Sequence, residues 1–283
     1  PVTVAGPLGE KVSCYYGFLE ETKTAVMEMA SAAGITLVIK KDPLRASTYG
    51  VGEMIADALK RGCKNFMIGI GGSATNDGGI GMLKALGFEF FDEDGNDVGE
   101  GAAALAKIAE IRTEKKNPLL SGAKFQIACD VKNPLCGKQG ATYIFGPQKG
   151  VTEEQKEQVD EAMRHYADVT KESLDCDFAD CEGAGAAGGL GYAFLSYLAG
   201  ELILGVELIL QATGLEEKMK NADVVVTGEG RLDAQTVMGK APAGVAALAK
   251  KYNAKVIAFA GSVAPEAKVC NRAGIDAFFP IVR

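Results

Sequence analysis

Residues 65–86, NFMIGIGGSATNDGGIGMLKAL, constrain the fold of this chain more than any other segment. The apolar run 66–70 is typical of a buried strand, and the apolar spacing that begins at Ile80 is typical of a helix. The loop between them, 71–79, contains four glycines together with Ser, Thr, Asn and Asp. A strand followed by such a loop and then by a helix can bind phosphate. Glycine lets backbone amides approach the anion, and the helix N-terminus adds partial positive charge.

The alternative for this loop is a tight turn in which glycines are needed only because they adopt positive φ angles without strain. The loop lacks the G-x-x-x-x-G-K-[ST] spacing, so it is not a Walker A loop. Because its glycines and polar residues exceed what a plain turn requires, we favour phosphate binding. The residues predicted to bind are Gly71, Gly72, Ser73, Thr75, Asn76, Gly78 and Gly79, with Asp77 as a candidate metal ligand or catalytic carboxylate.

Composition excludes several classes of function. The net charge of −7 argues against a nucleic-acid surface and suits local positive sites for small anions. The most apolar segment, 195–212, is interrupted by Glu201 and Glu207 and is not expected to span a membrane. The seven cysteines form no C-x-x-C pair, which indicates reduced thiols and a cytoplasmic protein. The single histidine, His165, lies in a charged helical stretch, so acid–base chemistry and metal binding fall to carboxylates, whose oxygens suit Mg²⁺.

The pattern of elements predicts an α/β protein. Short strands are expected within 1–40, a helix over 47–60, a strand over 125–129 and a polar helix over about 152–173. The loop 176–191 precedes an apolar region that we expect to be helical. From Asp223 the pattern becomes β-α-β-α-β, with helices over 234–251 and 264–273, which predicts a parallel sheet covered on both faces. A domain boundary is expected near 212–222.

The segment TGEGRLDAQT, 227–236, is the second candidate site, because it follows a predicted parallel strand at the edge where open α/β sheets bind ligands. Arg231 can clamp a carboxylate or phosphate with two hydrogen bonds. Glu229 and Asp233 can orient hydroxyls or hold a metal, although Asp233 is equally suited to capping the following helix. Lys240 and Pro242 are assigned to the first turns of that helix.

Asp130 follows another predicted strand and precedes an Asn-Pro turn. It is a candidate general base or Mg²⁺ ligand, and the alternative is a turn carboxylate that binds its own backbone. Two further motifs are discounted. GAGAAG at 183–188 matches G-x-G-x-x-G, but acidic residues precede it where a strand should lie, so a hinge or a ligand-approaching loop is favoured over a dinucleotide site. The acidic turn DEDGND lacks the full spacing of a calcium loop.

Four motifs resemble the bacterial glycerate kinase family, which phosphorylates D-glycerate with ATP. They are, in order, GIGGSATNDGGIGMLKALG, CDVKNPLCGKQGATYIFGPQKG, GAGAAGGLG and ADVVVTGEGRLDAQTVMGKAPAGVA. The resemblance implies two α/β domains with the active site between them, residues 1–212 approximating a mixed α/β inserted domain and 213–283 part of a Rossmann-like domain. It also implies that segments found before and after these motifs in the family are absent from this sequence, so the chain is expected to be a fragment.

The resemblance implies ATP and Mg²⁺ as cofactors, D-glycerate as substrate and 2-phosphoglycerate as product. The 71–79 loop would hold the ATP phosphates, Asp77 or Asp130 would hold Mg²⁺ or orient the attacking hydroxyl, and Arg231 would clamp the glycerate carboxylate with Glu229 and Asp233 beside it. No nucleic-acid or membrane partner is expected. Two alternatives stay open, a kinase for another small hydroxy acid and a non-catalytic protein that binds a phosphorylated metabolite.

Overall fold

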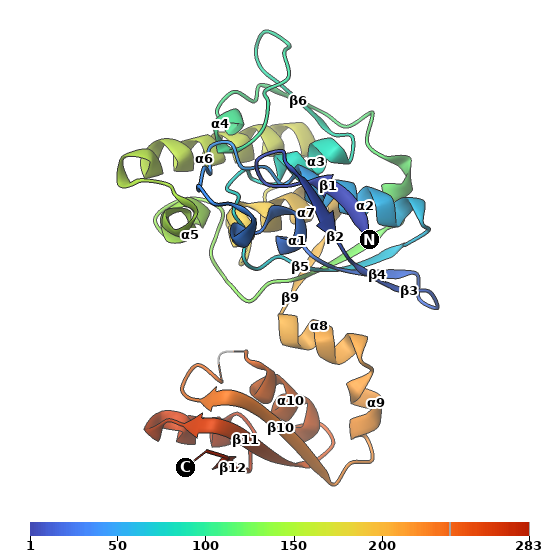
Figure 1. Ribbon diagram of the computed structural model, residues 1–283, viewed down its shortest axis with the longest axis vertical. Coiled ribbons are helices and arrows are strands. Elements are labelled where there is room, and N and C mark those ends of the chain that lie inside the picture. The colour runs from blue at the N-terminus through green and yellow to red at the C-terminus, as the bar shows by residue number, and fades with distance from the viewer. Residues whose placement is uncertain (238, 283) are drawn as a thin grey trace. The chain divides into compact units, whose positions relative to one another are not determined.

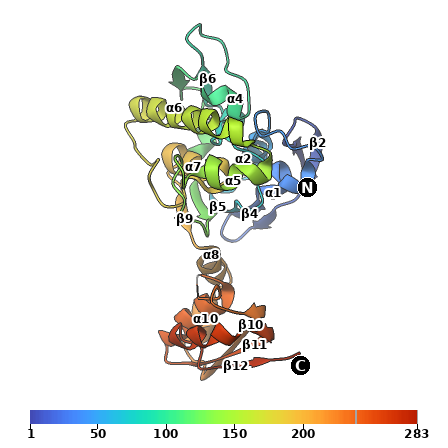
Figure 2. The ribbon, with the colours of Figure 1, turned by 90° about the vertical axis from the view of Figure 1, so that its left-hand side faces the viewer.

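The computed structural model describes residues 1–237 and 239–282, and the chain forms two compact units, Pro1–Ile203 and Leu204–Arg283 (Figure 1, Figure 2). Both units combine strands with helices, which confirms the α/β fold class. The predicted domain division after residue 212 stays a prediction; the compact units divide after Ile203. Among the described residues, no helix is long and apolar enough to cross a membrane.

A five-stranded sheet with the order β3-β4-β5-β8-β9 forms the centre of the N-terminal unit. Its strands are β3 (Gly17–Leu19), β4 (Thr24–Glu28), β5 (Asn65–Gly69), β8 (Lys124–Ala128) and β9 (Glu201–Ile203). Only β3 runs antiparallel to its neighbour. Because β5 and β8 are adjacent and parallel, with Gly69 opposite Ala128, the segments that follow them begin side by side at one edge of the sheet.

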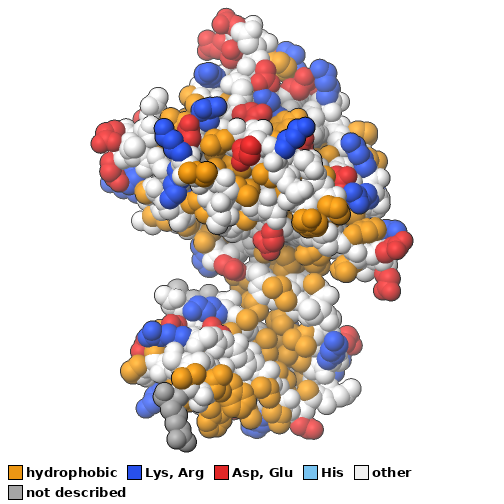
Figure 3. Space-filling model, in the orientation of Figure 1, with side chains coloured by type: hydrophobic (Ala, Val, Ile, Leu, Met, Phe, Trp, Pro, Cys, Tyr) orange, Lys and Arg blue, Asp and Glu red, His pale blue; other side chains and the backbone are white. Residues whose placement is uncertain are grey.

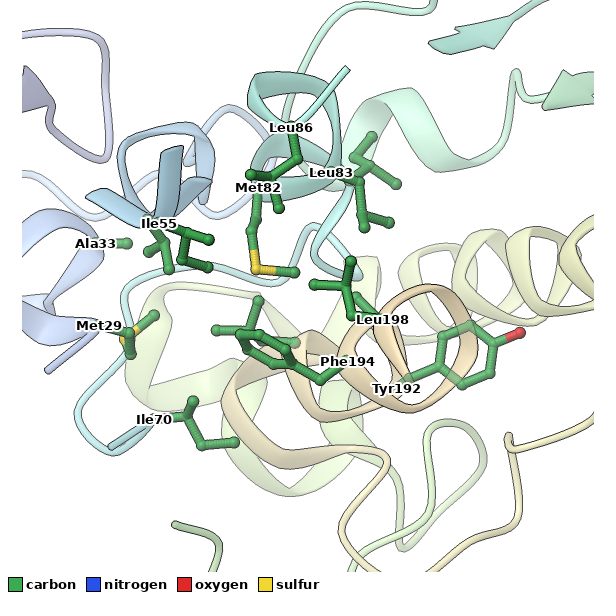
Figure 4. Close-up of a cluster of buried hydrophobic side chains, with 14 of the residues drawn as sticks. Met29, Ala33, Ile55, Ile70, Met82, Leu83, Leu86, Tyr192, Phe194 and Leu198 are labelled. Atoms are coloured by element: carbon green, nitrogen blue, oxygen red, sulfur yellow. The ribbon is translucent and has the colours of Figure 1, made fainter. Parts of the chain in front are cut away.

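Helices and two short antiparallel pairs surround this sheet. The helices are α1 (Ala30–Ala33), α2 (Tyr49–Lys60), α3 (Ile80–Ala85), α4 (Ala102–Leu105), α5 (Ala141–Lys149), α6 (Lys156–Leu174) and α7 (Leu190–Leu198). The pairs are β1 (Val2–Ala5) with β2 (Lys11–Cys14) and β6 (Glu89–Phe91) with β7 (Glu110–Arg112). Phe66 of β5 stacks on Phe125 of β8 at 4.8 Å between ring centroids, and Phe125 contacts Phe194 of α7. Figure 4 shows α7 contributing to this core with α2 and α3.

The apolar segment 195–212 is not the single helical region that we expected. α7 ends at Leu198, β9 follows, and α8 begins only at Gly205 and ends at Ala212. The helix α7 ends there because Ala199 adopts a left-handed conformation with φ +47°, a common way to close the last turn. A three-residue strand between two helices is too short for hydrophobic periodicity to reveal.

The C-terminal unit contains a parallel three-stranded sheet, β10 (Val224–Leu232), β11 (Lys255–Val263) and β12 (Ala277–Pro280). Its helices are α8, α9 (Leu215–Met219), α10 (Ala241–Lys250) and α11 (Val269–Arg272). The predicted β-α-β-α-β order is confirmed, but the helix expected over 234–251 begins only at Ala241. Pro242 lies in its first turn, where the missing amide of proline costs nothing.

One face of this three-stranded sheet is apolar and exposed, which contradicts the expectation that both faces are covered. Alternate residues of β11, such as Val256 and Ala258, are buried. The opposite face presents Val226, Phe259 and Phe279, which are 62%, 42% and 50% exposed. Figure 3 shows hydrophobic side chains gathered on the surface of the C-terminal unit. Within the described residues, the helices therefore cover only one face of a sheet type that is normally buried on both.

Candidate functional site

The loop between β5 and α3 has an exposed start and a buried remainder. Gly71 is exposed, whereas residues 73–79 are all buried. A Cβ added at Gly71 would meet no atom within 4 Å, but one at Gly79 would lie 2.5 Å from Cβ of Ala193. Gly78 and Gly79 also have positive φ angles. The turn interpretation thus explains Gly78 and Gly79, and it also explains Gly72, whose φ is +72°, but it leaves Gly71 without a structural reason for glycine.

Asp77 lies in the buried part and organises the loop around itself. Its Oδ2 accepts the N–H and the hydroxyl of Thr48, both at 2.8 Å, and the N–H of Gly81 at 3.3 Å. Its Oδ1 accepts the N–H of Gly79 at 3.2 Å. Burial raises the pKa of this carboxyl, and the hydrogen bonds that it accepts oppose that shift. Because these donors occupy its lone pairs and satisfy the N-terminus of α3, the geometry favours a structural role for Asp77 over metal binding or catalysis.

A pocket of about 240 Å³ opens at the edge of the sheet where β5 and β8 end. Four segments of the N-terminal unit line it: the start of the glycine-rich loop, the residues after β8, the end of α5, and a second glycine-rich segment. The lining residues are Ile70, Gly71, Gly72, Ser73, Ala128, Cys129, Asp130, Val131, Phe145, Gln148, Lys149, Ala186 and Ala187. Thr75, Asn76, Gly78 and Gly79, which we predicted to bind phosphate, lie beneath this surface and do not line it.

The amides of Gly71, Gly72 and Ser73 donate no hydrogen bond to another group among the described residues. The amide of the next residue, Ala74, is already bound to the carbonyl of Ala33 at 2.9 Å. Three consecutive amides without acceptors on the wall of a pocket form a surface that can bind an anion. The sequence prediction of a phosphate loop is therefore best supported for these three residues, and it stays a prediction for the loop as a whole.

Lys149, the last residue of α5, is a pocket residue that the sequence did not single out. It is only 2% exposed, and its Nζ donates a 2.7 Å hydrogen bond to the carbonyl of Thr75. Burial lowers the pKa of Lys149 to about 7, while the charge of Asp77 raises it. The pocket thus combines unengaged amides with a buried amine whose protonation changes near neutral pH.

The second glycine-rich segment, which matched G-x-G-x-x-G, packs directly on the first. The carbonyl of Gly188 accepts the N–H of Gly78 at 2.9 Å. Ala187, which lines the pocket, is held in a left-handed conformation with φ +54°. The segment follows a turn and not a strand, so it lacks the strand-loop-helix setting of a dinucleotide site. Its position agrees with the interpretation of a ligand-approaching loop.

Asp130 lies two residues beyond the end of β8, is exposed, and lines the same pocket. Asp130 is therefore accessible to a ligand in the pocket. Its predicted role as general base or Mg²⁺ ligand stays a prediction. The geometry favours it over Asp77, because Asp130 is exposed at the pocket and Asp77 is buried beneath it.

The second predicted site, TGEGRLDAQT, spans the end of β10 and the turn after it. The hydroxyl of Thr236 donates a short hydrogen bond to Oε1 of Glu229. Asp233 does not cap α10, whose N-cap is Lys240; instead its Oδ1 accepts the N–H of Gln235 at 2.9 Å and closes the turn. The capping alternative for Asp233 is thus replaced by a turn-forming role.

Two cations flank the Asp233 carboxylate. Arg231 Nε lies 3.9 Å from it and Lys240 Nζ lies 3.7 Å from it. Both are loose contacts, and the Arg231 side chain is 66% exposed, so its guanidinium remains accessible to an anionic ligand. The substrate role predicted for Glu229, Arg231 and Asp233 stays a prediction.

A family model described as the glycerate kinase family matches residues 1–283. This chain belongs to the glycerate kinase family. Glycerate kinase from Bacillus subtilis (strain 168) is 47% identical over 281 residues, which cover 99% of this chain and 74% of the relative. Glycerate 2-kinase from Escherichia coli (strain K12) has the same identity and coverage. A crystal structure of glycerate kinase 2 from Salmonella typhimurium LT2 superposes with a TM-score of 0.91 at 44% identity, over 99% of this chain and 74% of that one.

A glycerate kinase uses ATP, and phosphoryl transfer from ATP implies Mg²⁺. Among the described residues, no group of three or more His, Cys, Asp or Glu side chains could hold a metal. Mg²⁺ does not require such a cage, because it is commonly held by one or two carboxylates together with substrate phosphates. Asp130 fits that arrangement from the pocket wall, whereas Asp77 does not.

Lys149 is the residue of the pocket that sequence reasoning missed. A signal was available in the spacing of α5, since Thr142, Gly146 and Lys149 share one face of a helix at intervals of four and three residues. A lysine on the same face as small buried residues is expected to point inward. The spacing could not show that Lys149 binds the carbonyl of Thr75, because Thr75 lies 74 residues away in the chain.

Proposed function

We propose that this chain catalyses the ATP-dependent phosphorylation of D-glycerate to 2-phosphoglycerate. The observation that carries the proposal is the match to the glycerate kinase family along the whole chain, with relatives named glycerate kinase and glycerate 2-kinase. The pocket supports it independently, because its amides and its buried amine suit the phosphate tail of a nucleotide. We also propose that the enzyme works in the cytoplasm on small molecules and without a nucleic-acid partner.

The start of the glycine-rich loop would bind the nucleotide. The amides of Gly71, Gly72 and Ser73 would donate to the phosphate oxygens, and the Ser73 hydroxyl would assist. Phosphoryl transfer passes through a loose transition state, so the protein acts mainly by positioning the phosphates and neutralising their charge. Backbone amides suit this task because their positions are fixed by the fold before the ligand arrives.

Asp130 would act where the transferred phosphoryl group meets the attacking hydroxyl. Mg²⁺, when bound through Asp130 and the phosphates, would supply charge neutralisation on the phosphate oxygens. If Asp130 instead contacts the substrate, its carboxylate would accept the hydroxyl proton of glycerate as the new P–O bond forms and the bond to the ADP oxygen breaks. Within the C-terminal unit, the exposed guanidinium of Arg231 would bind a carboxylate such as that of glycerate, with Glu229 and Asp233 available to orient hydroxyls.

A coupled assay of ADP formation over a panel of small hydroxy acids, with phosphorus NMR of the product, tests this function. We expect Mg²⁺-dependent turnover with D-glycerate and a phosphate on its second carbon. If turnover occurs only with another hydroxy acid, that acid and not D-glycerate is the substrate. Nucleotide binding without turnover on any acid would instead support a binding protein and overturn the kinase assignment.

Gly71→Ala tests the role of the loop in nucleotide binding. The added methyl group meets no protein atom within 4 Å and the backbone conformation tolerates it, so thermal stability should not change. It projects where a phosphate would approach, and we expect the KM for ATP to rise about tenfold with the KM for glycerate retained. Gly17→Ala, in exposed strand β3 with ordinary contacts to Val26, is the matched control and should alter neither constant. An unchanged KM for ATP in Gly71→Ala would place the phosphates elsewhere.

A further inference from the structure

Lys149 is a buried cation that has no carboxylate beside it to balance its charge among the described residues. Its side chain is 2% exposed, and in the described part of the chain its Nζ forms no ion pair with a carboxylate. Lysines are almost never fully buried unless they are paired, because desolvating an ammonium costs several kcal/mol. A group that is this costly to bury and has no carboxylate partner among the described residues is explained by an anion that binds later.

The one hydrogen bond of Lys149 leaves most of its donor capacity unused. An ammonium has three N–H donors, and the carbonyl of Thr75 takes one of them at 2.7 Å. The charge of Asp77 favours the charged form of Lys149, but the oxygens of Asp77 already accept bonds from Thr48, Gly79 and Gly81. The remaining donors of Lys149 are therefore available to a ligand.

The position of Lys149 shows what kind of ligand that is. It lines the same 240 Å³ pocket as Gly71, Gly72 and Ser73, whose amides have no acceptor among the described residues. An uncharged ligand would satisfy the amides but would leave the ammonium unpaired. An anion with several oxygens, such as the phosphate tail of a nucleotide, would satisfy both.

We propose that Lys149 is the cation that binds the nucleotide phosphates in this pocket, together with the amides of Gly71, Gly72 and Ser73. The inference rests on the proposed kinase function and adds a residue to it. In a Walker A loop the phosphate-binding lysine belongs to the loop itself. Here the lysine comes from the end of α5, 74 residues beyond Thr75 in the chain, and its bond to the Thr75 carbonyl anchors it on the loop that carries the amides.

Two variants separate the charge of Lys149 from its structural bond. Lys149→Gln removes the charge but keeps an N–H donor for the Thr75 carbonyl, whereas Lys149→Met removes both. Lys132→Met removes an exposed lysine that follows the pocket residue Val131 and pairs with Glu182, and it is the matched control. Titration calorimetry at pH 7 with inorganic tripolyphosphate and with ATP, and thermal unfolding of each variant, provide the readouts.

We expect Lys149→Gln and Lys149→Met to lose about tenfold or more in affinity for tripolyphosphate and ATP, with the KM for glycerate nearly unchanged. Lys132→Met should bind as the wild type does. If Lys149→Met fails to fold, Lys149→Gln decides. A folded Lys149→Gln protein with wild-type affinity, or a wild-type chain that binds no tripolyphosphate, would overturn the inference.

The same experiment keeps this inference distinct from the proposed function. Tripolyphosphate binding does not require turnover, so its dependence on Lys149 can be measured even if the chain phosphorylates no glycerate. Turnover by the wild type together with full nucleotide affinity in Lys149→Gln would leave the kinase function in place and remove only the role of Lys149.

Discussion

Replacing Asp77 with asparagine should destabilise the N-terminal unit by about 3–5 kcal/mol. The carboxylate is fully buried and accepts four hydrogen bonds. Their donors are the amide and hydroxyl of Thr48 and the amides of Gly79 and Gly81. Asparagine has nearly the same shape, but its NH₂ group would face donors and leave them buried without an acceptor. Urea unfolding followed by circular dichroism measures the loss of stability.

Asp92→Asn is the matched control for this prediction. Asp92 also accepts backbone amides, those of Asp94 and Asn96, but it does so in an exposed turn where water can replace the lost bonds. We expect a change below about 1 kcal/mol there. Hydrogen exchange should accelerate at the amides of Thr48 and Gly81 in the Asp77 variant only. Equal effects of the two substitutions would show that Asp77 does not organise the loop.

The strand, loop and helix of residues 65–86 could be predicted from the sequence because their signals are local. The division of the 71–79 loop into an exposed start and a buried remainder could not be predicted, because it depends on contacts from distant segments. A Cβ added at Gly78 would lie 2.8 Å from the ring of Tyr166, and one added at Gly79 would clash with Ala193. Only these neighbours show that the end of the loop is structural, and only the pocket shows that its start is accessible.

The contacts of Asp77 could not be predicted for the same reason. An aspartate in a glycine-rich loop is suited to metal binding by its residue type alone. Its partner Thr48 lies 29 residues earlier, just before α2, and no spacing rule connects the two positions. By contrast, Asp130 does line the pocket, because the carboxyl ends of adjacent parallel strands meet at one edge, and its role as general base or metal ligand stays a prediction.

The C-terminal unit shows where periodicity succeeds and where it fails. Continuous apolar runs correctly predict that β10, β11 and β12 are parallel strands. The same runs predict burial on both faces, whereas Phe259 and Phe279 are exposed among the described residues. A pattern of residues specifies which surfaces are apolar, and only the packed structure shows which of them are covered.

The free energy of unfolding should depend on pH through Lys149. Burial lowers its pKa to about 7 in the folded chain, against about 10.4 in an unfolded one, while Asp77 is the charge that opposes the shift. Between these two values the unfolded chain binds one more proton than the folded chain does. Raising the pH in this window therefore stabilises the fold, by about 1.4 kcal/mol per pH unit at most.

Comparison with Lys149→Met isolates this contribution from the other titrating groups. Below pH 7 the lysine is charged in both states, so its destabilising effect is largest there and constant. From pH 7 to about pH 10 the wild type should gain stability relative to the variant, by an amount on the order of 4 kcal/mol in total. Urea unfolding of both proteins at pH 6, 7, 8 and 9 measures the difference. Parallel curves would show that Lys149 stays protonated in the folded chain.

Saturating tripolyphosphate should remove most of this pH dependence near neutrality. An anion in the pocket stabilises the ammonium and raises its pKa, so the folded chain keeps its proton over a wider range of pH. Binding above pH 7 must then take up a proton, and affinity should fall as the pH rises from 7. The charge of Lys149 is costly in the empty pocket and favourable in the occupied one. This difference gives the pocket its preference for phosphate over neutral ligands.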